Sequence, residues 1–248
     1  MESLEFVCQN IGILKVIGNR LHDGHDFVVK SNAKTHAIDY LIFFDSRGIS
    51  CKFEGSLADK LISQITLSGF SYLLVCRPIE LTTWATLINF MVINTLNPGK
   101  IISNMGFVDF TPKKLAILED AIEQVEFTIG KGVATSMFVE AYISSSGEGI
   151  DLYSMSYSEE YKKAIECITN KIPTVIINTP IVAEDIDIER KRPHSFYVGL
   201  AIAKEFNQTI KTAQLVDIPD FDELLTYDAV HWTQQGNEVI FEKIKDYL

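Results

Sequence analysis

The chain has 248 residues, of which 47% are hydrophobic and 22% are charged. These proportions are typical of a water-soluble protein with one full-sized α/β domain. The formal net charge is −11, and the acidic residues are spread along the chain rather than gathered in a tail. Because such a surface repels phosphate groups, we expect no nucleic-acid partner.

The cysteines and the apolar stretches favour a cytoplasmic protein without a membrane span. The first residues lack the basic start and apolar core of a signal peptide. The longest apolar stretch, residues 84–96, is too short to cross a bilayer. We predict reduced thiols, no metal and no cofactor, because no metal-binding spacing occurs among the four cysteines, which are Cys8, Cys51, Cys76 and Cys167.

Residues 1–36 are predicted to form a small β-rich lead-in to the main domain, residues 37–248. Residues 11–17 and 27–30 have strand-like composition, and an Asp-Gly turn signal lies between them. Two histidines and two aspartates in this spacer could be interpreted as a metal cluster. A polar turn is the commoner explanation for His22, Asp23, His25 and Asp26.

The first half of the main domain alternates buried strands and helices. Continuous apolar runs at residues 40–44 and 72–76 indicate strands covered on both faces. A third strand is expected at residues 100–105. Helical spacing or capping signals predict helices at residues 56–67 and from Thr82 or Thr83 to Leu96.

The second half continues the same alternation. Residues 127–150 are rich in glycine and serine and predict a mobile loop around a short element at 136–143, and residues 184–194 form a charged loop that is a candidate lid. Helices are expected at 113–126, 158–170, 196–206 and 237–247, and strands at 172–178 and 214–218. The pattern predicts one α/β domain with a doubly wound, mostly parallel sheet flanked by helices.

Two polar motifs stand out as candidates for catalysis. Asp228 and His231 lie three residues apart before the last helix, where a carboxylate can orient an imidazole that acts as a general base. Ser46 follows the strand at 40–44, and functional groups gather at the carboxyl ends of strands in such sheets. The sequence therefore predicts Ser46 as the nucleophile whose proton His231 accepts. The same residues would also fit a purely structural explanation, in which Ser46 is a turn serine and Asp228 and His231 cap the start of the last helix.

Three blocks of residues together resemble the SGNH (GDSL-like) hydrolase superfamily. Phe44-Asp45-Ser46 is similar to its Gly-Asp-Ser block, and Gly106-Phe107-Val108-Asp109 to its Gly-x-Asn-Asp block. Asp228-Ala229-Val230-His231, followed by Gly236-Asn237, matches its last block. The resemblance covers residues 38–248. It implies a flavodoxin-like three-layer sandwich and a Ser46–His231–Asp228 triad that forms an acyl-serine, with Asp45 and Asp109 as supporting groups.

The departures from the family pattern fall on the oxyanion hole. Val108 stands where the family has an asparagine and can offer only a backbone N–H. No glycine follows the second strand, where the family supplies a further amide. Oxyanion and substrate contacts are therefore sought among Ser46, Gly106, Val108, Arg77 and Thr82, with Asn104 as a further candidate. Arg77 could equally form a surface pair with Glu80.

The resemblance implies a serine esterase or O-acyltransferase acting on O-acetyl groups of carbohydrates or on small polar esters. A transferase would also need an acetyl donor. Trp232 is either a sugar-stacking platform or core packing. A degenerate protein that binds a carbohydrate or a partner without turnover is the alternative, and so is a different α/β protein in which the match is accidental. The sequence does not indicate an oligomeric state.

Overall fold

A computed structural model describes most of the main domain. The described residues are 28–35, 37–50, 53–77, 81–133, 137, 144–146, 150–152, 158–190 and 192–248. Most of the predicted lead-in, including its polar turn, lies outside them, as does the element expected at 136–143 apart from Met137. In the described part of the chain, no helix is both long and apolar enough to cross a membrane.

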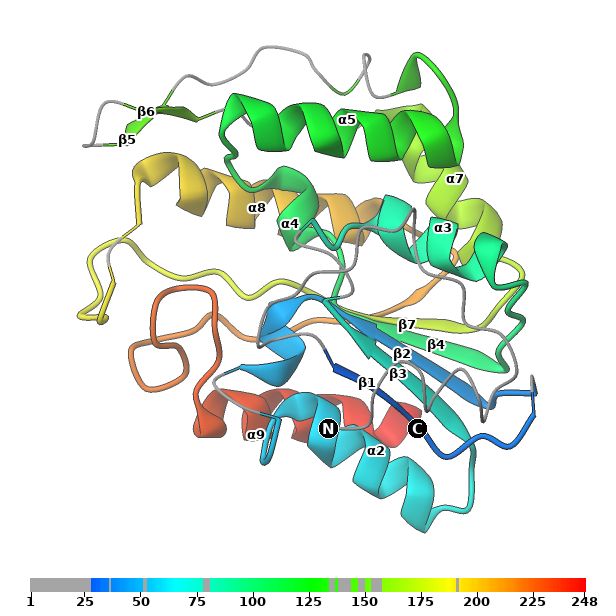
Figure 1. Cartoon of the computed structure of the whole chain (residues 1–248). Coiled ribbons are helices and arrows are strands. Elements are labelled where there is room, and N and C mark those ends of the chain that lie inside the picture. Colours follow the sequence, from blue (N-terminus) through cyan, green and yellow to red (C-terminus); the bar gives the residue numbers. More distant parts are fainter. Residues whose placement is uncertain are drawn as a thin grey trace.

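A six-stranded sheet forms the centre of the described part of the chain (Figure 1). Its strands are β1 (Val28–Ser31), β2 (Tyr40–Phe44), β3 (Tyr72–Cys76), β4 (Lys100–Ser103), β7 (Thr174–Ile177) and β8 (Gln214–Val216). The strand order is β1-β3-β2-β4-β7-β8, and only β1 runs antiparallel to its neighbour. Without β1, this is the doubly wound order of flavodoxin-like proteins, so the predicted fold class is confirmed.

Helices cover both faces of the sheet. The helices are α2 (Leu57–Leu67), α3 (Trp84–Ile93), α4 (Phe107–Phe110), α5 (Leu115–Ile129), α7 (Glu159–Thr169), α8 (His194–Thr209) and α9 (Gln234–Ile244). In Figure 1, α2 and α9 lie below the sheet and the other helices lie above it. Successive residues of a strand point to opposite faces. Accordingly, Leu41 and Phe43 pack into the core on the α3 side, and Ile42 and Phe44 into the core on the α2 side.

Local capping explains where the predicted helices begin. The Ser56 hydroxyl accepts the amide hydrogen of Asp59 and starts α2, and Thr83 forms a capping box with Thr86 at the start of α3. The last helix begins at Gln234, three residues before the predicted start, because Thr233 caps it by accepting from the Gly236 amide. It ends in the 3-10 turn η2 (Lys245–Tyr247).

Four short elements in the described part of the chain were absent from the sequence prediction. Residues Ser46–Ile49 form a 3-10 helix, η1, and residues 107–110 form α4. β5 (Ser144–Ser146), in the segment predicted as a loop, pairs as an antiparallel hairpin with β6 (Ile150–Leu152), which begins at the last residue of that segment. β1 lies within the predicted lead-in but pairs with β3 in the main sheet. The domain boundary at residue 36, between the lead-in and the main domain, stays a prediction.

Candidate active site

The candidate nucleophile lies at the carboxyl end of the central strand β2. Ser46 is the first residue of η1, and Asp45 caps this turn by accepting the Arg47 amide hydrogen at 2.9 Å. β2 lies between β3 and β4, where the chain changes direction across the sheet. That switch point is where ligands bind in open α/β sheets. The sequence places Ser46 there because the apolar run of β2 ends abruptly in polar residues.

A buried ion pair supports the turn that carries Ser46. Arg47 is 1% exposed, and its guanidinium meets both carboxylate oxygens of Asp45, with an Nη2–Oδ2 distance of 2.8 Å. The same guanidinium donates to the backbone oxygen of Asn104 and to the Thr179 hydroxyl. It also lies over the Phe107 ring, 4.6 Å from its centroid. Arg47 thereby ties together the ends of β2, β4 and β7.

Asn104 belongs to this buried network and is engaged by it. Its Oδ1 accepts the Asp45 amide hydrogen at 3.0 Å, and its Nδ2 donates to Asp45 Oδ1 at 2.9 Å. Asn104 is fully buried. A side chain held at both ends in this way braces Asp45, and the supporting role of Asp45 at the site stays a prediction.

The candidate base lies in a tight turn before α9. Asp228 Oδ1 accepts the amide hydrogens of Val230 (3.1 Å) and His231 (2.8 Å). Ala229 between them has a φ of 63°, a left-handed conformation that costs a residue with a Cβ on the order of 1 kcal/mol. The turn brings the His231 Nδ1 to 3.2 Å from each Asp228 carboxylate oxygen. The carboxylate can therefore hold the proton on Nδ1 and leave Nε2 free to accept one.

The nucleophile and the base meet although they are 185 residues apart in the chain. The His231 Nε2 lies 3.3 Å from the Ser46 Oγ. The Ser50 hydroxyl joins the two turns, because its oxygen accepts the Trp232 amide hydrogen at 2.9 Å. Trp232 itself is 1% exposed and packs in the core, so it is not a stacking platform for a sugar.

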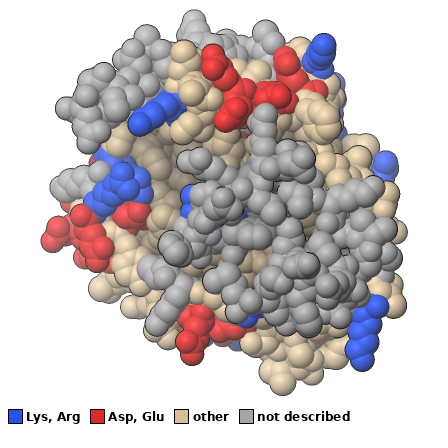
Figure 2. Space-filling model, in the orientation of Figure 1, with Lys and Arg blue, Asp and Glu red and all other residues tan. Residues whose placement is uncertain are grey.

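The charged loop expected at 184–194 contributes a residue to this site. Arg192 donates through its Nε to the Asp228 backbone oxygen at 3.1 Å and through its Nη2 to Asp228 Oδ2. The Glu189 amide donates to the Tyr227 backbone oxygen at 3.1 Å. Figure 2 shows basic and acidic side chains close together at the edge of the molecule where this loop lies.

The carboxyl of Asp228 is held in its charged form. Burial on its own raises the pKa of Asp228. Hydrogen bonds from the His231 side chain and amide, and the charges of His231 and Arg192, outweigh burial and hold the pKa of Asp228 well below its usual range. The group beside the imidazole is thus an anion throughout the neutral pH range.

The block after β4 forms the start of α4. Gly106 has a φ of 114°, and a Cβ there would lie 2.7 Å from Asn207 Oδ1, so only glycine fits. Its amide donates to Asp109 Oδ2 at 3.2 Å. Gly106 is therefore a positioning residue of the loop, with its own N–H already engaged. The amides of Phe107 and Val108, at the first turn of α4, have no acceptor within the helix.

Asp109 caps the start of α3 together with Tyr161. Asp109 Oδ1 accepts the Trp84 amide hydrogen and the Tyr161 hydroxyl, and the Tyr161 oxygen accepts the Ala85 amide hydrogen, each amide contact being 3.2 Å. Burial raises the pKa of Asp109 and of Tyr161, and burial lowers the pKa of nearby Lys113 to about 8. Asp109 thus braces both α3 and the Gly106 loop, and its supporting role at the site stays a prediction.

The start of α3 matters because the SGNH hydrolases, which the three sequence blocks resemble, take an oxyanion amide from the region after the second strand. The corresponding strand here is β3, and α3 is the helix that follows it. The first three amides of α3 already donate to protein oxygens. The Trp84 amide donates to Asp109, the Ala85 amide to Tyr161 and the Thr86 amide to Thr83. Thr82 just before it is buried. Arg77 directly follows β3 and has a φ of 46°, and its amide donates to the Phe44 backbone oxygen at 2.8 Å.

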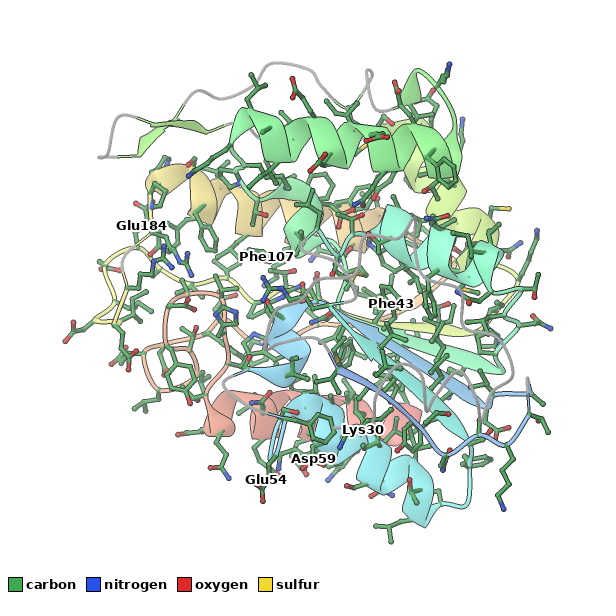
Figure 3. The ribbon with its side chains drawn as sticks, viewed as in Figure 1. Lys30, Phe43, Glu54, Asp59, Phe107 and Glu184 are labelled. Carbon is green, nitrogen blue, oxygen red and sulfur yellow. The ribbon has the colours of Figure 1, made fainter. Side chains whose placement is uncertain are left out.

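The parallel strands place most sequence-predicted site residues at one edge of the sheet. Ser46, Arg77 and Val108 follow β2, β3 and β4 in turn, and Phe107 beside Val108 is labelled near this edge in Figure 3. The sequence analysis missed Arg47, Arg192, Lys113 and Tyr161. Asp45 and Arg47, which flank Ser46, were a usable local signal for Arg47. Arg192 and Tyr161 contact Asp228 and Asp109 from distant parts of the chain and left no local pattern, whereas Lys113 contacts the nearby backbone oxygens of Val108 and Thr111.

Comparison with solved structures finds similar folds. Est24, a carbohydrate acetylesterase from Sinorhizobium meliloti, is 11% identical with a TM-score of 0.47, over 85% of this chain and 97% of that one. A protein from Parabacteroides merdae described as a GDSL-like lipase is 11% identical with a TM-score of 0.42, over 85% and 95%. The esterase EstA from Pseudoalteromonas sp. is 8% identical with a TM-score of 0.42, over 84% and 95%.

Neither a protein-family profile nor a curated protein sequence matches the chain. The names of the similar structures include the GDSL-like group, which the three sequence blocks resemble. Because the three TM-scores are below 0.5, the chemistry of this chain is inferred from its own residues.

Proposed function

We propose that this chain is a divergent SGNH-like serine esterase or O-acyltransferase. The observation that carries the proposal is the continuous path from Ser46 Oγ to His231 Nε2 (3.3 Å) and from His231 Nδ1 to the Asp228 carboxylate (3.2 Å). A hydroxyl, an imidazole and a half-buried carboxylate in this order form the arrangement that activates a serine. A cytoplasmic location stays a prediction.

In the proposed reaction, the Ser46 Oγ attacks the ester carbonyl carbon while its proton passes to His231 Nε2. Asp228 stabilises the imidazolium that forms. The tetrahedral intermediate collapses, the bond to the ester oxygen breaks, and the imidazolium gives its proton to the leaving alcohol. Water, or a sugar hydroxyl in a transferase, then attacks the acyl-serine and loses its proton to His231. The bond between the acyl carbon and Ser46 Oγ breaks, and the imidazolium returns the proton to Ser46 Oγ.

The oxyanion hole is proposed to consist of two backbone amides. Ser46 is the first residue of η1 and Val108 lies in the first turn of α4, so neither amide has an acceptor within its own helix. Gly106 and the start of α3 are engaged elsewhere. Loss of one oxyanion donor typically costs about 10²–10³ in rate. We therefore expect a slow enzyme compared with one that has the family asparagine.

The proposed substrates are O-acetyl groups of carbohydrates or other small polar esters. His231 is 36% exposed in its side chain, so the base is open to solvent, and the adjoining loop is charged rather than apolar. Such surroundings suit a polar ester better than a long acyl chain.

Hydrolysis of p-nitrophenyl acetate tests the proposal. Ser46→Ala and His231→Ala are each expected to lower kcat by at least about 10³-fold. Ser63→Ala is the matched control, because Ser63 is an exposed serine of α2. Intact-mass spectrometry of the acid-quenched wild type should show an acetyl adduct that Ser46→Ala lacks. Equal rates in wild type and Ser46→Ala would exclude Ser46 as the nucleophile.

A binding protein without turnover is the second candidate. It is favoured by Val108 at the position of the family asparagine and by the engagement of the Gly106 amide with Asp109. In this case no acetyl adduct forms, and acetylated oligosaccharides bind with equal affinity to wild type and Ser46→Ala in calorimetry. A measurable adduct on wild type would exclude it.

A further inference from the structure

Arg192 contacts the candidate triad from outside the three sequence blocks. We propose that Arg192 is a positioning residue that holds Asp228 in place for His231, so that Arg192, at the end of the charged segment 184–192, controls the strength of the base. This inference rests on the proposed function. The resemblance assigns no role to this segment.

The geometry around Asp228 shows what Arg192 adds. Asp228 Oδ1 is held by the amides of Val230 and His231 within its own turn. Oδ2 receives no backbone hydrogen bond among those of the described residues. It faces only the His231 Nδ1 at 3.2 Å and the Arg192 Nη2. Arg192 therefore holds Oδ2, the carboxylate oxygen that receives no hydrogen bond from the backbone of the turn that carries Asp228.

Arg192 grips Asp228 at two points. Its Nε donates to the Asp228 backbone oxygen at 3.1 Å while its Nη2 meets the carboxylate. The planar guanidinium thus sets the carboxylate relative to the backbone of the same residue. The two side chains are only 16% and 15% exposed, so water screens this pair less than a surface ion pair.

Arg192 is itself held in place by aromatic packing. Its guanidinium lies over the Phe196 ring, 5.2 Å from the centroid. Phe196 in turn packs edge-on against Phe107, with 5.3 Å between ring centroids. Phe107 belongs to α4, where the proposed oxyanion amide lies. Figure 3 shows Phe107 near the strand ends and Glu184 beside the start of α8, where its carboxylate pairs with His194.

Two consequences follow from the charges that face the imidazole. His231 is flanked by Asp228 on its own turn and by the neutral Ser46 on η1, and Arg192 faces the far side of Asp228. Removing the guanidinium frees the carboxylate to move, which lowers kcat. It also removes a positive charge, so the imidazolium becomes easier to form and the acid limb of the pH profile moves to higher pH.

The test compares Arg192→Gln, Arg192→Lys and the matched control Arg190→Gln. Arg190 is exposed and lies two residues earlier, so its substitution makes the same change in net charge. For Arg192→Gln, kcat should fall about 10-fold, KM should stay within about twofold, and the pH of half-maximal kcat/KM should rise by about half a unit to one unit. Arg192→Lys should recover part of both effects, and Arg190→Gln should match wild type.

A second measurement separates this inference from the proposed function. The ring signal of His231 is followed by NMR against pH in wild type and in the three variants, which needs no turnover. A titration midpoint that rises in Arg192→Gln alone supports the inference even if the protein has no esterase activity. The same midpoint and the same kcat in Arg192→Gln and Arg190→Gln would overturn it. A rise in KM alone would also overturn it, because it would assign Arg192 to substrate binding.

Discussion

The side-chain oxygen of Ser50 accepts the backbone amide hydrogen of Trp232 across 2.9 Å. Ser50 follows η1, which begins at Ser46, and Trp232 follows His231. The Ser50 hydroxyl also donates to the Arg47 backbone oxygen at 2.7 Å. One buried hydroxyl therefore links the turn of the nucleophile to the turn of the base, next to both reacting groups.

We predict that Ser50→Ala weakens both the site and the fold. The Trp232 amide would lose its partner in a buried position, which costs about 1–3 kcal/mol of unfolding free energy. The Ser46–His231 distance would loosen, so kcat should fall about 10-fold with little change in KM. Urea unfolding and p-nitrophenyl acetate kinetics measure the two effects, with Ser63→Ala as the control. Wild-type kcat in a destabilised Ser50→Ala would show that the link is structural only.

The buried pair of Asp45 and Arg47 leads to a second prediction. Arg47→Met leaves the Asp45 carboxylate buried without its cation, so the unfolding free energy should fall by about 3–5 kcal/mol. The double variant Asp45→Asn/Arg47→Met removes both charges and should regain much of that loss. Denaturant unfolding of the single and double variants forms the required cycle. Additive losses would mean that the two side chains contribute independently.

The sequence predicted the sheet, and it brought together the residues of the candidate triad, for physical reasons. The strands at 40–44 and 72–76 are buried on both faces, so their continuous apolar runs were unambiguous. Ser46 could be predicted because it follows the central strand, and strand ends of a parallel sheet converge. The turn from Asp228 to His231 is local, and its carboxylate caps its own backbone.

The surroundings of the triad could not be predicted in the same way. Arg192 lies in a loop where charged residues normally face water, and no periodicity connects it with Asp228. Arg47 is 1% exposed, against the general rule that arginine stays at the surface. Tyr161 reaches Asp109 from a helix 52 residues further along the chain. Such contacts depend on how separate elements pack.

The buried amine of Lys113 makes stability depend on pH. Its Nζ donates to the backbone oxygens of Val108 and Thr111, and burial lowers its pKa to about 8, although the charge of Asp109 works against burial. Between pH 8 and 10 the unfolded chain then binds more protons than the folded one, so the unfolding free energy should rise with pH. Above pH 10 the raised pKa of Tyr161 has the opposite effect.

This prediction is checked by urea unfolding at pH 8, 9 and 10. The gain for wild type should be on the order of 1–3 kcal/mol. Lys113→Met has no amine to titrate and should show a flatter dependence. Lys114→Met is the matched control, because Lys114 is exposed and adjacent. An equal slope in wild type and Lys113→Met would assign the pH dependence to other groups.

The last prediction concerns Val108 and the strength of the oxyanion hole. Val108 is partly exposed at the first turn of α4, so a side chain there can reach the solvent-facing side of the site. Val108→Asn adds a side-chain amide donor at the position where the SGNH hydrolases, which the sequence blocks resemble, have an asparagine. Loss of one oxyanion donor typically lowers the rate by about 10²–10³-fold. Because the chain has packed around valine, we expect a smaller gain in kcat, about 10-fold, with little change in KM.

Val108→Ala and Val108→Leu are the controls for this gain. Both alter the packing of the side chain against the two cores without adding a donor, and neither should raise kcat. The double variant Val108→Asn/Ser46→Ala should be as inactive as Ser46→Ala, since the donor acts only on an oxyanion that Ser46 creates. A gain that persists without Ser46 would place the reaction elsewhere on the protein. No gain in Val108→Asn, with the fold intact, would mean that the oxyanion does not form beside α4.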